Sequence, residues 1–193
     1  MHKTLINTLA NYGSFKPEEI EICKSLFKET IVKRGDFFIR AGEVSKYIGF
    51  ISEGLVRYFV YKNDTESTLE FSSEGEFIVE YESFLEKTKC IQNIQALEDT
   101  KMLITDHQGL QTLYNTIENS ETIGRQIIEY RFKHLMKQLL SIYMHNPEER
   151  YLHFMKTFPD LIQRVPQYYI ASYVGVKPES LSRIKKRIAS QIS

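Results

Sequence analysis

Residues 167–186 read QYYIASYVGVKPESLSRIKK, and this stretch has the residues that two short helices need to pack across a tight turn. Ala171 is small enough for the helices to approach closely, and Gly175 tolerates the left-handed conformation of the turn. Pro178 suits the first turn of the second helix, where its missing N–H donor costs nothing. The stretch therefore predicts a helix-turn-helix whose shared interior is apolar and consists of Ile170, Val174, Val176, Leu181 and Ile184.

The outer face of the predicted second helix is polar and basic. From Arg164 to Arg187 there are six basic residues and one acidic residue, Glu179, although the whole chain has 25 of each and is neutral. Arginine can bridge guanine O6 and N7, and serine and glutamate can contact base edges. Lysine and arginine both neutralise phosphate charge. A charged helix that merely faces solvent would explain the excess of basic residues. Double-stranded DNA as partner explains both that excess and the helix-turn-helix spacing. The predicted contact residues are Gln167, Lys177, Glu179, Ser180, Ser182, Arg183, Lys186 and Arg187.

The middle of the chain has the pattern of short strands. Five glycines between positions 35 and 75 separate runs rich in aromatic and β-branched residues. Val56, Tyr58 and Val60 alternate with their neighbours at the period of a pleated strand. Such spacing predicts a small sandwich or barrel, preceded by a helix that begins near Pro17. The predicted strands are 36–39, 47–51, 55–61, 67–71, 91–97 and 101–105.

Residues 117–145 contain no proline and one glycine, which predicts a long helix that ends before Pro147. Apolar residues recur along it at alternating steps of four and three, as in a coiled-coil seam, and these are Ile128, Phe132, Leu135, Leu139 and Ile142. Met136, Leu140 and Tyr143 form a second line beside the seam. The seam is explained either by a second copy of the chain or by the protein's own core. The predicted domains are 1–116, 117–145 and 146–193.

Other classes of protein find little support in the sequence. There is no GxSxG, P-loop, HExxH or GxGxxG motif, so we expect no enzyme. Cys23 and Cys90 are too far apart for a metal knuckle or a CxxC motif, so we expect no metal site. Two lone thiols suit a reducing cytoplasm. No stretch approaches the roughly 20 apolar residues of a membrane span, so we expect no membrane association.

The order of these parts resembles the cAMP receptor protein/Fnr (Crp/Fnr) family of bacterial transcription regulators. Residues 35–43, 47–54 and 75–80 look like the family's β-roll, and Pro178 to Arg183 looks like its Arg-Glu-Thr-Val-Gly-Arg signature. The resemblance implies an α+β protein with an N-terminal β-roll, a long dimerisation helix and a C-terminal helix-turn-helix domain. It further implies a homodimer on near-palindromic DNA, base contacts from Glu179 and Arg183, and RNA polymerase as a partner.

The sequence departs from the family at the ligand site. Family members that bind cyclic nucleotides use a Gly-Glu pair and an Arg-Ser pair, and here these positions read Val79-Glu80 and Cys90-Ile91. Cysteine and isoleucine offer no cation to a phosphate. Only a shift of the alignment by one residue would place Lys89 in the ligand pocket. We therefore expect no cyclic nucleotide and no cofactor; another small effector, or none, stays open. Two cysteines are too few for an iron–sulfur cluster within one chain.

Two further expectations concern the C-terminal part. After the recognition helix only residues 188–193 follow in this sequence, so we expect the domain to lack a full wing. The alternative to a regulator is a β-roll module that has lost its ligand, does not bind DNA and acts as a protein-interaction or scaffold partner. Binding to duplex DNA separates the two.

Overall fold

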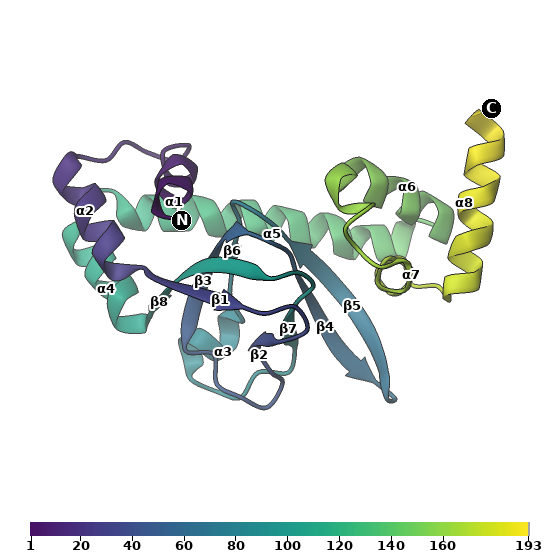
Figure 1. Cartoon of the computed structure of the whole chain (residues 1–193), viewed down its shortest axis with the longest axis horizontal. Coiled ribbons are helices and arrows are strands. Elements are labelled where there is room, and N and C mark those ends of the chain that lie inside the picture. Colours follow the sequence, from purple (N-terminus) through teal and green to yellow (C-terminus); the bar gives the residue numbers. More distant parts are fainter. Residues whose placement is uncertain (193) are drawn as a thin grey trace. The chain divides into compact units, whose positions relative to one another are not determined.

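The computed structural model describes residues 1–192. Figure 1 shows the order of its elements. The helices are α1 (His2–Leu9), α2 (Pro17–Leu26), α3 (Tyr81–Glu86), α4 (His107–Thr116), α5 (Ser120–Met144), α6 (Pro147–Thr157), the 3-10 helix η1 (Pro159–Leu161), α7 (Gln167–Val174) and α8 (Pro178–Ile192). The strands are β1 (Lys28–Val32), β2 (Phe37–Ile39), β3 (Tyr47–Glu53), β4 (Val56–Lys62), β5 (Thr65–Ser72), β6 (Phe77–Ile78), β7 (Asn93–Ala96) and β8 (Thr100–Asp106).

The described chain divides into two compact units. The first consists of Met1–Val60 and Glu70–Arg131, and the second consists of Tyr61–Leu69 and the chain from Phe132 onward. The boundary falls within the long helix. The physical reason is that Ile123 and Ile127 at its start pack into the core of the first unit.

The first unit is built on two four-stranded sheets that enclose an apolar interior. Their strand orders are β1-β8-β3-β6 and β2-β7-β4-β5, and the pairs β1–β8, β3–β8, β3–β6, β2–β7 and β4–β7 are antiparallel (Figure 1). Alternation along each strand sends every second side chain inward. The interior is therefore lined from both sheets, by Ile39, Ile51, Val56, Tyr58, Ile78, Cys90, Ile94 and Met102.

Helices cover the other face of the β1-β8-β3-β6 sheet. Phe50 of β3 and Leu103 of β8 point to that face and pack with apolar residues of α1, α2, α4 and the start of α5. Glu19 of α2 fastens this layer, because its carboxylate accepts hydrogen bonds from the backbone N–H of Lys16 at 2.7 Å and of Glu118 at 3.0 Å. Lys16 also pairs through its ammonium with the Glu118 carboxylate at 2.9 Å.

Two of the differences from the sequence predictions concern the first unit and the start of the long helix. Strand β1 was not predicted, although it pairs with β8 along its whole length. Ile31 of β1 is exposed, so the strand has no clean apolar stripe that alternation could reveal. The long helix begins at Ser120 rather than at 117, because Asn119 has the left-handed backbone (φ +63°) that separates it from α4.

In the second unit the tip of the β4–β5 hairpin is fastened to helices. Asn63 and Asp64 both have positive φ, as a two-residue hairpin turn requires. The Ser172 hydroxyl of α7 accepts a hydrogen bond from Thr68 N at 2.9 Å and donates one to Glu66 O at 3.1 Å. The Gln138 amide of α5 donates to the Leu69 carbonyl. Helix side chains thus satisfy backbone groups on the outer edge of β5.

The three last helices of the second unit pack around an aromatic and aliphatic core. Phe154 of α6 lies 5.4 Å from Tyr173 of α7 and 5.5 Å from Phe158, measured between ring centroids. Helix α6 begins with a capping box: Asn146 Oδ1 accepts from the N–H groups of Glu148 and Glu149, and the Glu149 carboxylate in turn accepts from Asn146 N. Pro147 occupies the first helical position, where it needs no N–H partner.

Candidate nucleic-acid interface and β-roll interior

The turn between α7 and α8 explains why the sequence needs glycine there. Gly175 has the left-handed conformation (φ +78°, ψ +37°), and its N–H and that of Val176 donate to carbonyls of the last turn of α7. The two helices bury a common set of side chains, namely Ile170, Ala171, Val174, Leu181, Ile184 and Ile188. The buried residues of α8 recur at steps of three and four, so its opposite face points outward.

The outward face of α8 presents the predicted cations and polar groups. Lys177, Glu179, Ser182, Arg183 and Lys186 are exposed, and Ser180 is half-buried. The Arg183 guanidinium donates to the Ser180 hydroxyl at 3.2 Å, and the Ser182 hydroxyl donates to Pro178 O at 3.1 Å. Short polar groups therefore lie in the first turns at the N-terminal end of the helix, with Lys177 directly before them and Arg183 and Lys186 beyond or beside them. A recognition helix in the major groove contacts bases through this end.

Two other predicted contact residues are already engaged with neighbouring helices. Gln167 at the start of α7 accepts a hydrogen bond from the Lys185 ammonium at 2.8 Å through its Oε1. Arg187 pairs with Glu148 of α6. Sequence reasoning missed both partners, because a pairing across 18 or 39 positions leaves no periodic signal. The basic residues of α8 thus divide into a group that faces outward and a group that joins the three helices.

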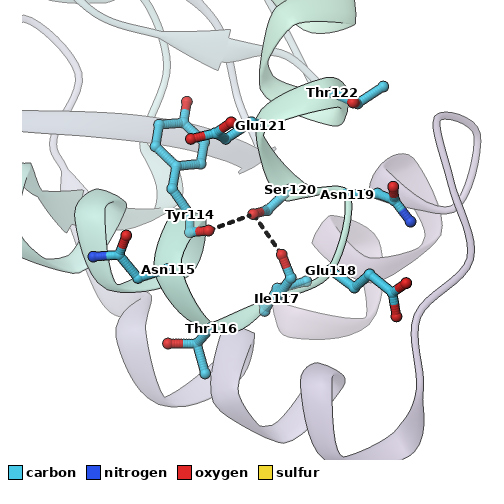
Figure 2. A pocket seen from close by; sticks show the side chains of 9 residues that line it. All are labelled: Tyr114, Asn115, Thr116, Ile117, Glu118, Asn119, Ser120, Glu121 and Thr122. Carbon is cyan, nitrogen blue, oxygen red and sulfur yellow. Dashed lines mark hydrogen bonds between the residues drawn. The ribbon is translucent and has the colours of Figure 1, made fainter.

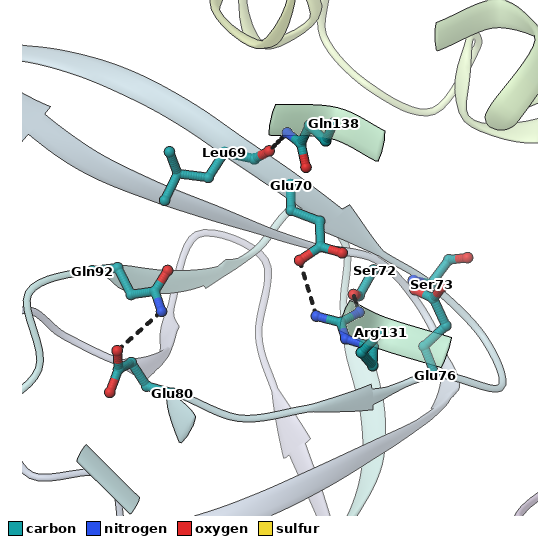
Figure 3. A network of polar contacts seen from close by, with 9 residues as sticks. All are labelled: Leu69, Glu70, Ser72, Ser73, Glu76, Glu80, Gln92, Arg131 and Gln138. Carbon is teal, nitrogen blue, oxygen red and sulfur yellow. Dashed lines mark hydrogen bonds and ion pairs between the residues drawn. The ribbon is translucent and has the colours of Figure 1, made fainter. Parts of the chain in front are cut away.

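Inside the β-roll, both oxygens of the Glu80 carboxylate accept hydrogen bonds from the protein itself. Glu80 caps helix α3, and one oxygen accepts from Ser83 N at 2.8 Å (Figure 3 shows the side chain). The other oxygen accepts from the Gln92 amide at 3.1 Å. Gln92 was not among the predicted site residues. This carboxylate is buried, and both of its oxygens have protein donors.

The residues at the positions of the family's Arg-Ser pair do not form an anion site. The buried Cys90 thiol donates to Arg40 O at 2.9 Å, and burial, reinforced by the charge of Glu80, raises its pKa. Ile91 points outward with 77% of its surface exposed. Lys89 is exposed, so the register turns Cys90 inward instead of Lys89. Val79 is half-buried beside Glu80. These residues do not fit a cyclic phosphate, which needs a cation or several N–H donors.

A partly buried ion pair joins the sheet to the long helix in the first unit. The Arg131 guanidinium of α5 lies 2.9 Å from the Glu70 carboxylate of β5 and donates to the Ser72 hydroxyl at 3.2 Å (Figure 3). Burial raises the pKa of Glu70 against the opposing effect of Arg131. Burial likewise raises the pKa of Tyr58, whose ring centroid is 5.8 Å from the guanidinium carbon. This cation is committed to protein partners.

The predicted coiled-coil seam is not part of the protein's own core. Its five residues Ile128, Phe132, Leu135, Leu139 and Ile142 are between 41% and 61% exposed. The second line, with Met136, Leu140 and Tyr143, is exposed as well. Helix α5 thus presents a broad exposed apolar surface.

A hollow of about 480 Å³ lies at the loop between α4 and α5 (Figure 2). Residues Tyr114 to Thr122 line it, and none of them was predicted as a site residue. The Ser120 hydroxyl is directed at the loop's own carbonyls, with Ile117 O at 2.7 Å and Tyr114 O at 3.4 Å. The Ser120 hydroxyl therefore stabilises the backbone of this loop.

Within residues 1–192 no three His, Cys, Asp or Glu side chains gather as metal ligands would. No helix in that part of the chain has the length and apolar character of a membrane span. Both cysteines are free and buried, and burial raises the pKa of Cys23 to about 11.

Comparison with known proteins agrees with this architecture. Residues 29–116 match the family described as cyclic nucleotide-binding domain. The structure is similar to that of FixK2 from Bradyrhizobium japonicum, with 14% identity, a TM-score of 0.75 and coverage of 86% of this chain and 85% of that one. The chain has the fold of the Crp/Fnr regulators.

Two more Crp/Fnr structures show the same similarity. The c-di-GMP responsive global regulator CLP from Xanthomonas campestris has 17% identity, a TM-score of 0.72 and coverage of 91% of this chain and 93% of its own. A CooA mutant from Carboxydothermus hydrogenoformans has 18% identity, a TM-score of 0.70 and coverage of 89% and 79%. Comparison with curated protein sequences gave no match. The Crp/Fnr-type fold with a β-roll and C-terminal helix-turn-helix is therefore confirmed, at identities that establish the fold alone.

Proposed function

We propose that this protein is a DNA-binding transcription regulator of the Crp/Fnr type that acts as a homodimer on near-palindromic sites. The observation that carries the proposal is the two-sided character of α8. Leu181, Ile184 and Ile188 are buried, while Arg183 and Lys186 of the helix and Lys177 directly before it are exposed. A helix of this kind after a tight glycine turn supplies both the shape and the charge that the major groove accepts.

The apolar seam of α5 supports the dimer. Two copies that pair through this seam would place their recognition helices symmetrically, and two half-sites about 34 Å apart would accept them. Such a dimer at a promoter would have RNA polymerase as its neighbour. The free, buried thiols fit a reducing cytoplasm. Nothing in the proposed mechanism requires catalysis.

We further propose that the β-roll takes no cyclic nucleotide. Each oxygen of the buried Glu80 carboxylate already accepts a hydrogen bond, from Ser83 N and from the Gln92 amide, and Ile91 is exposed. We expect calorimetric titration with cAMP and with cGMP to give no heat of binding, and the melting temperature to stay unchanged with either. Saturable binding of either nucleotide would contradict this part of the proposal and leave DNA binding unaffected.

The decisive experiment measures binding to random duplex DNA at several salt concentrations. Lys177→Glu with Lys186→Glu reverses two exposed charges of the proposed interface, and Lys46→Glu with Lys89→Glu reverses two exposed charges of the β-roll. If Lys177 and Lys186 both contact phosphates, the first pair should flatten the slope of log K against log salt by roughly 0.9 per contact. The control pair should leave the slope unchanged.

Equal behaviour of the two double variants, or no binding by the wild-type protein at low salt, would exclude the regulator. In that case a scaffold role of the β-roll is the remaining candidate. Selection of bound sequences from random duplexes then tests palindromy, because a symmetric dimer should enrich inverted half-sites.

A further inference from the structure

Arg150 lies in the second turn of α6 and reaches the ends of two other helices. Its Nε donates to Val174 O at 2.7 Å, and one terminal nitrogen donates to His145 O at 2.6 Å. Val174 is the last residue of α7, and His145 follows Met144, the last residue of α5. Carbonyls at helix C-termini have no partner within the helix and lie at the negative end of the dipole. A guanidinium satisfies both needs at once.

The second terminal nitrogen of Arg150 lies against the turn of the helix-turn-helix. A Cβ placed on Gly175 would be 3.4 Å from it. The side chain therefore bonds to the end of α5 and the end of α7, and it lies close to the turn that leads into α8. The two carboxylates next to Arg150 in the sequence have other partners. Glu148 pairs with Arg187, and Glu149 accepts a hydrogen bond from Asn146 N.

Only arginine can make this set of contacts. Its planar fork offers donors in fixed directions from one rigid group, whereas lysine has a single charged nitrogen on a flexible stem. Hydrogen bonds from a charged donor are also stronger than neutral ones. The geometry thus fixes the Val174 carbonyl relative to the His145 carbonyl, and so fixes the start of α8 relative to the end of α5.

We propose that Arg150 is a positioning residue that sets the orientation of the recognition helix α8 relative to the C-terminal half of the dimer helix α5. The proposal rests on the proposed function, because this orientation determines the separation of the two recognition helices in a dimer. DNA imposes a fixed separation of half-sites. Arg150 therefore governs which half-site spacing the dimer accepts, without touching DNA itself.

The first test measures spacing preference. Binding is compared between duplexes with the selected spacing, with one base pair inserted, with one removed, and with a single half-site. For Arg150→Lys we expect the preference for the selected spacing to fall about tenfold, the scale of one lost charged hydrogen bond. Single half-site affinity should stay within about twofold. Arg34→Lys, an exposed arginine of the β-roll, should change neither.

The outcome that overturns the proposal is an unchanged spacing preference, or an equal fall of paired and single half-site affinity. Equal falls would mean that Arg150 merely supports folding of the helix-turn-helix. Circular dichroism melts of Arg150→Lys and Arg34→Lys identify loss of folding directly.

The second test needs no DNA. Spin labels at Lys133→Cys in α5 and Lys186→Cys in α8 of one protomer, diluted with unlabelled protein, report the distance between the helices. We expect Arg150→Lys to broaden the distance distribution and Arg34→Lys to leave it as in the wild type. An unaltered distribution overturns the proposal. Failure of all DNA binding by the wild type would instead overturn the proposed function, and this second test still decides the role of Arg150.

Discussion

The Arg131 guanidinium and the Glu70 carboxylate lie 2.9 Å apart with only 22% and 13% of their side chains exposed, and this pair ties α5 to β5. Exposed ion pairs contribute little to stability, whereas removing one partner of a buried pair leaves an uncompensated charge. The pair therefore makes the joint between the long helix and the sheet sensitive to single substitutions.

Arg131→Met should lower the free energy of unfolding by about 3 kcal/mol, because Glu70 stays buried without its cation. Adding Glu70→Leu should recover most of that loss, since the double variant removes both charges. Urea unfolding measures the two values. Arg125→Met breaks an exposed pair with Glu129 on the same helix and should cost less than about 1 kcal/mol. Equal losses for Arg125→Met and Arg131→Met would contradict the buried pair's role.

Glu19 should make folding sensitive to acid. Hydrogen bonds from Lys16 N, opposed by burial and reinforced by Glu118 N, hold the pKa of Glu19 below its ordinary value of 4.5. A carboxyl with a lowered pKa stabilises the fold above that value and loses the effect as pH falls through the folded pKa. Glu19→Gln should therefore be less stable than the wild type at neutral pH, and the difference should shrink on acidification below pH 4.5. A difference that does not depend on pH, in denaturant titrations, would refute this.

Gly175→Ala and Gly35→Ala form a matched pair. Both glycines have positive φ, but a Cβ on Gly35 meets nothing within 4 Å, whereas one on Gly175 approaches Arg150. Each should lose about 1–2 kcal/mol of stability from backbone strain. DNA affinity should fall only for Gly175→Ala, because only that turn leads into α8. Thermal melts and duplex titrations separate the two effects, and a similar loss of affinity in Gly35→Ala would show that strain alone is responsible.

Leu135→Glu places a charge in the apolar seam of α5 and should separate the dimer into folded monomers. Leu152→Glu, at a similarly exposed leucine of α6, should leave the association state unchanged. Sedimentation equilibrium at micromolar concentration distinguishes the species. If both variants are dimers, the interface lies outside the apolar seam of α5. If the wild-type protein is a monomer, the proposed homodimer is wrong.

Much of the architecture could be predicted because its signals are local. Glycine at 175, proline at 178 and apolar residues at helical steps define α7 and α8 within 20 positions, and glycines delimit most of the strands. Strand β1 escaped because its exposed Ile31 breaks the apolar alternation.

The contacts that organise the sites could not be predicted, because they join distant residues. Arg131 meets Glu70 across 61 positions, and Arg150 meets Val174 across 24. Arg57 is the clearest case: alternation along β4 suggests that a charged residue faces water, yet it is 1% exposed. Its guanidinium bonds to the Gln95 side chain and lies 3.9 Å from the Phe59 ring centroid. Packing of this kind depends on the folded neighbours and not on the pattern.

The hydrogen bonds that link Ser172 and Gln138 to β5 bear on how the protein avoids aggregation through a strand edge. An outermost strand with unpaired N–H and C=O groups is a template for a foreign strand, and proteins commonly shield it. Here the shield is supplied by residues that come much later in the chain. A nascent or proteolysed fragment that ends before α5 and α7 would expose the edge of β5. Such fragments should therefore be prone to amyloid-like stacking that the whole chain avoids.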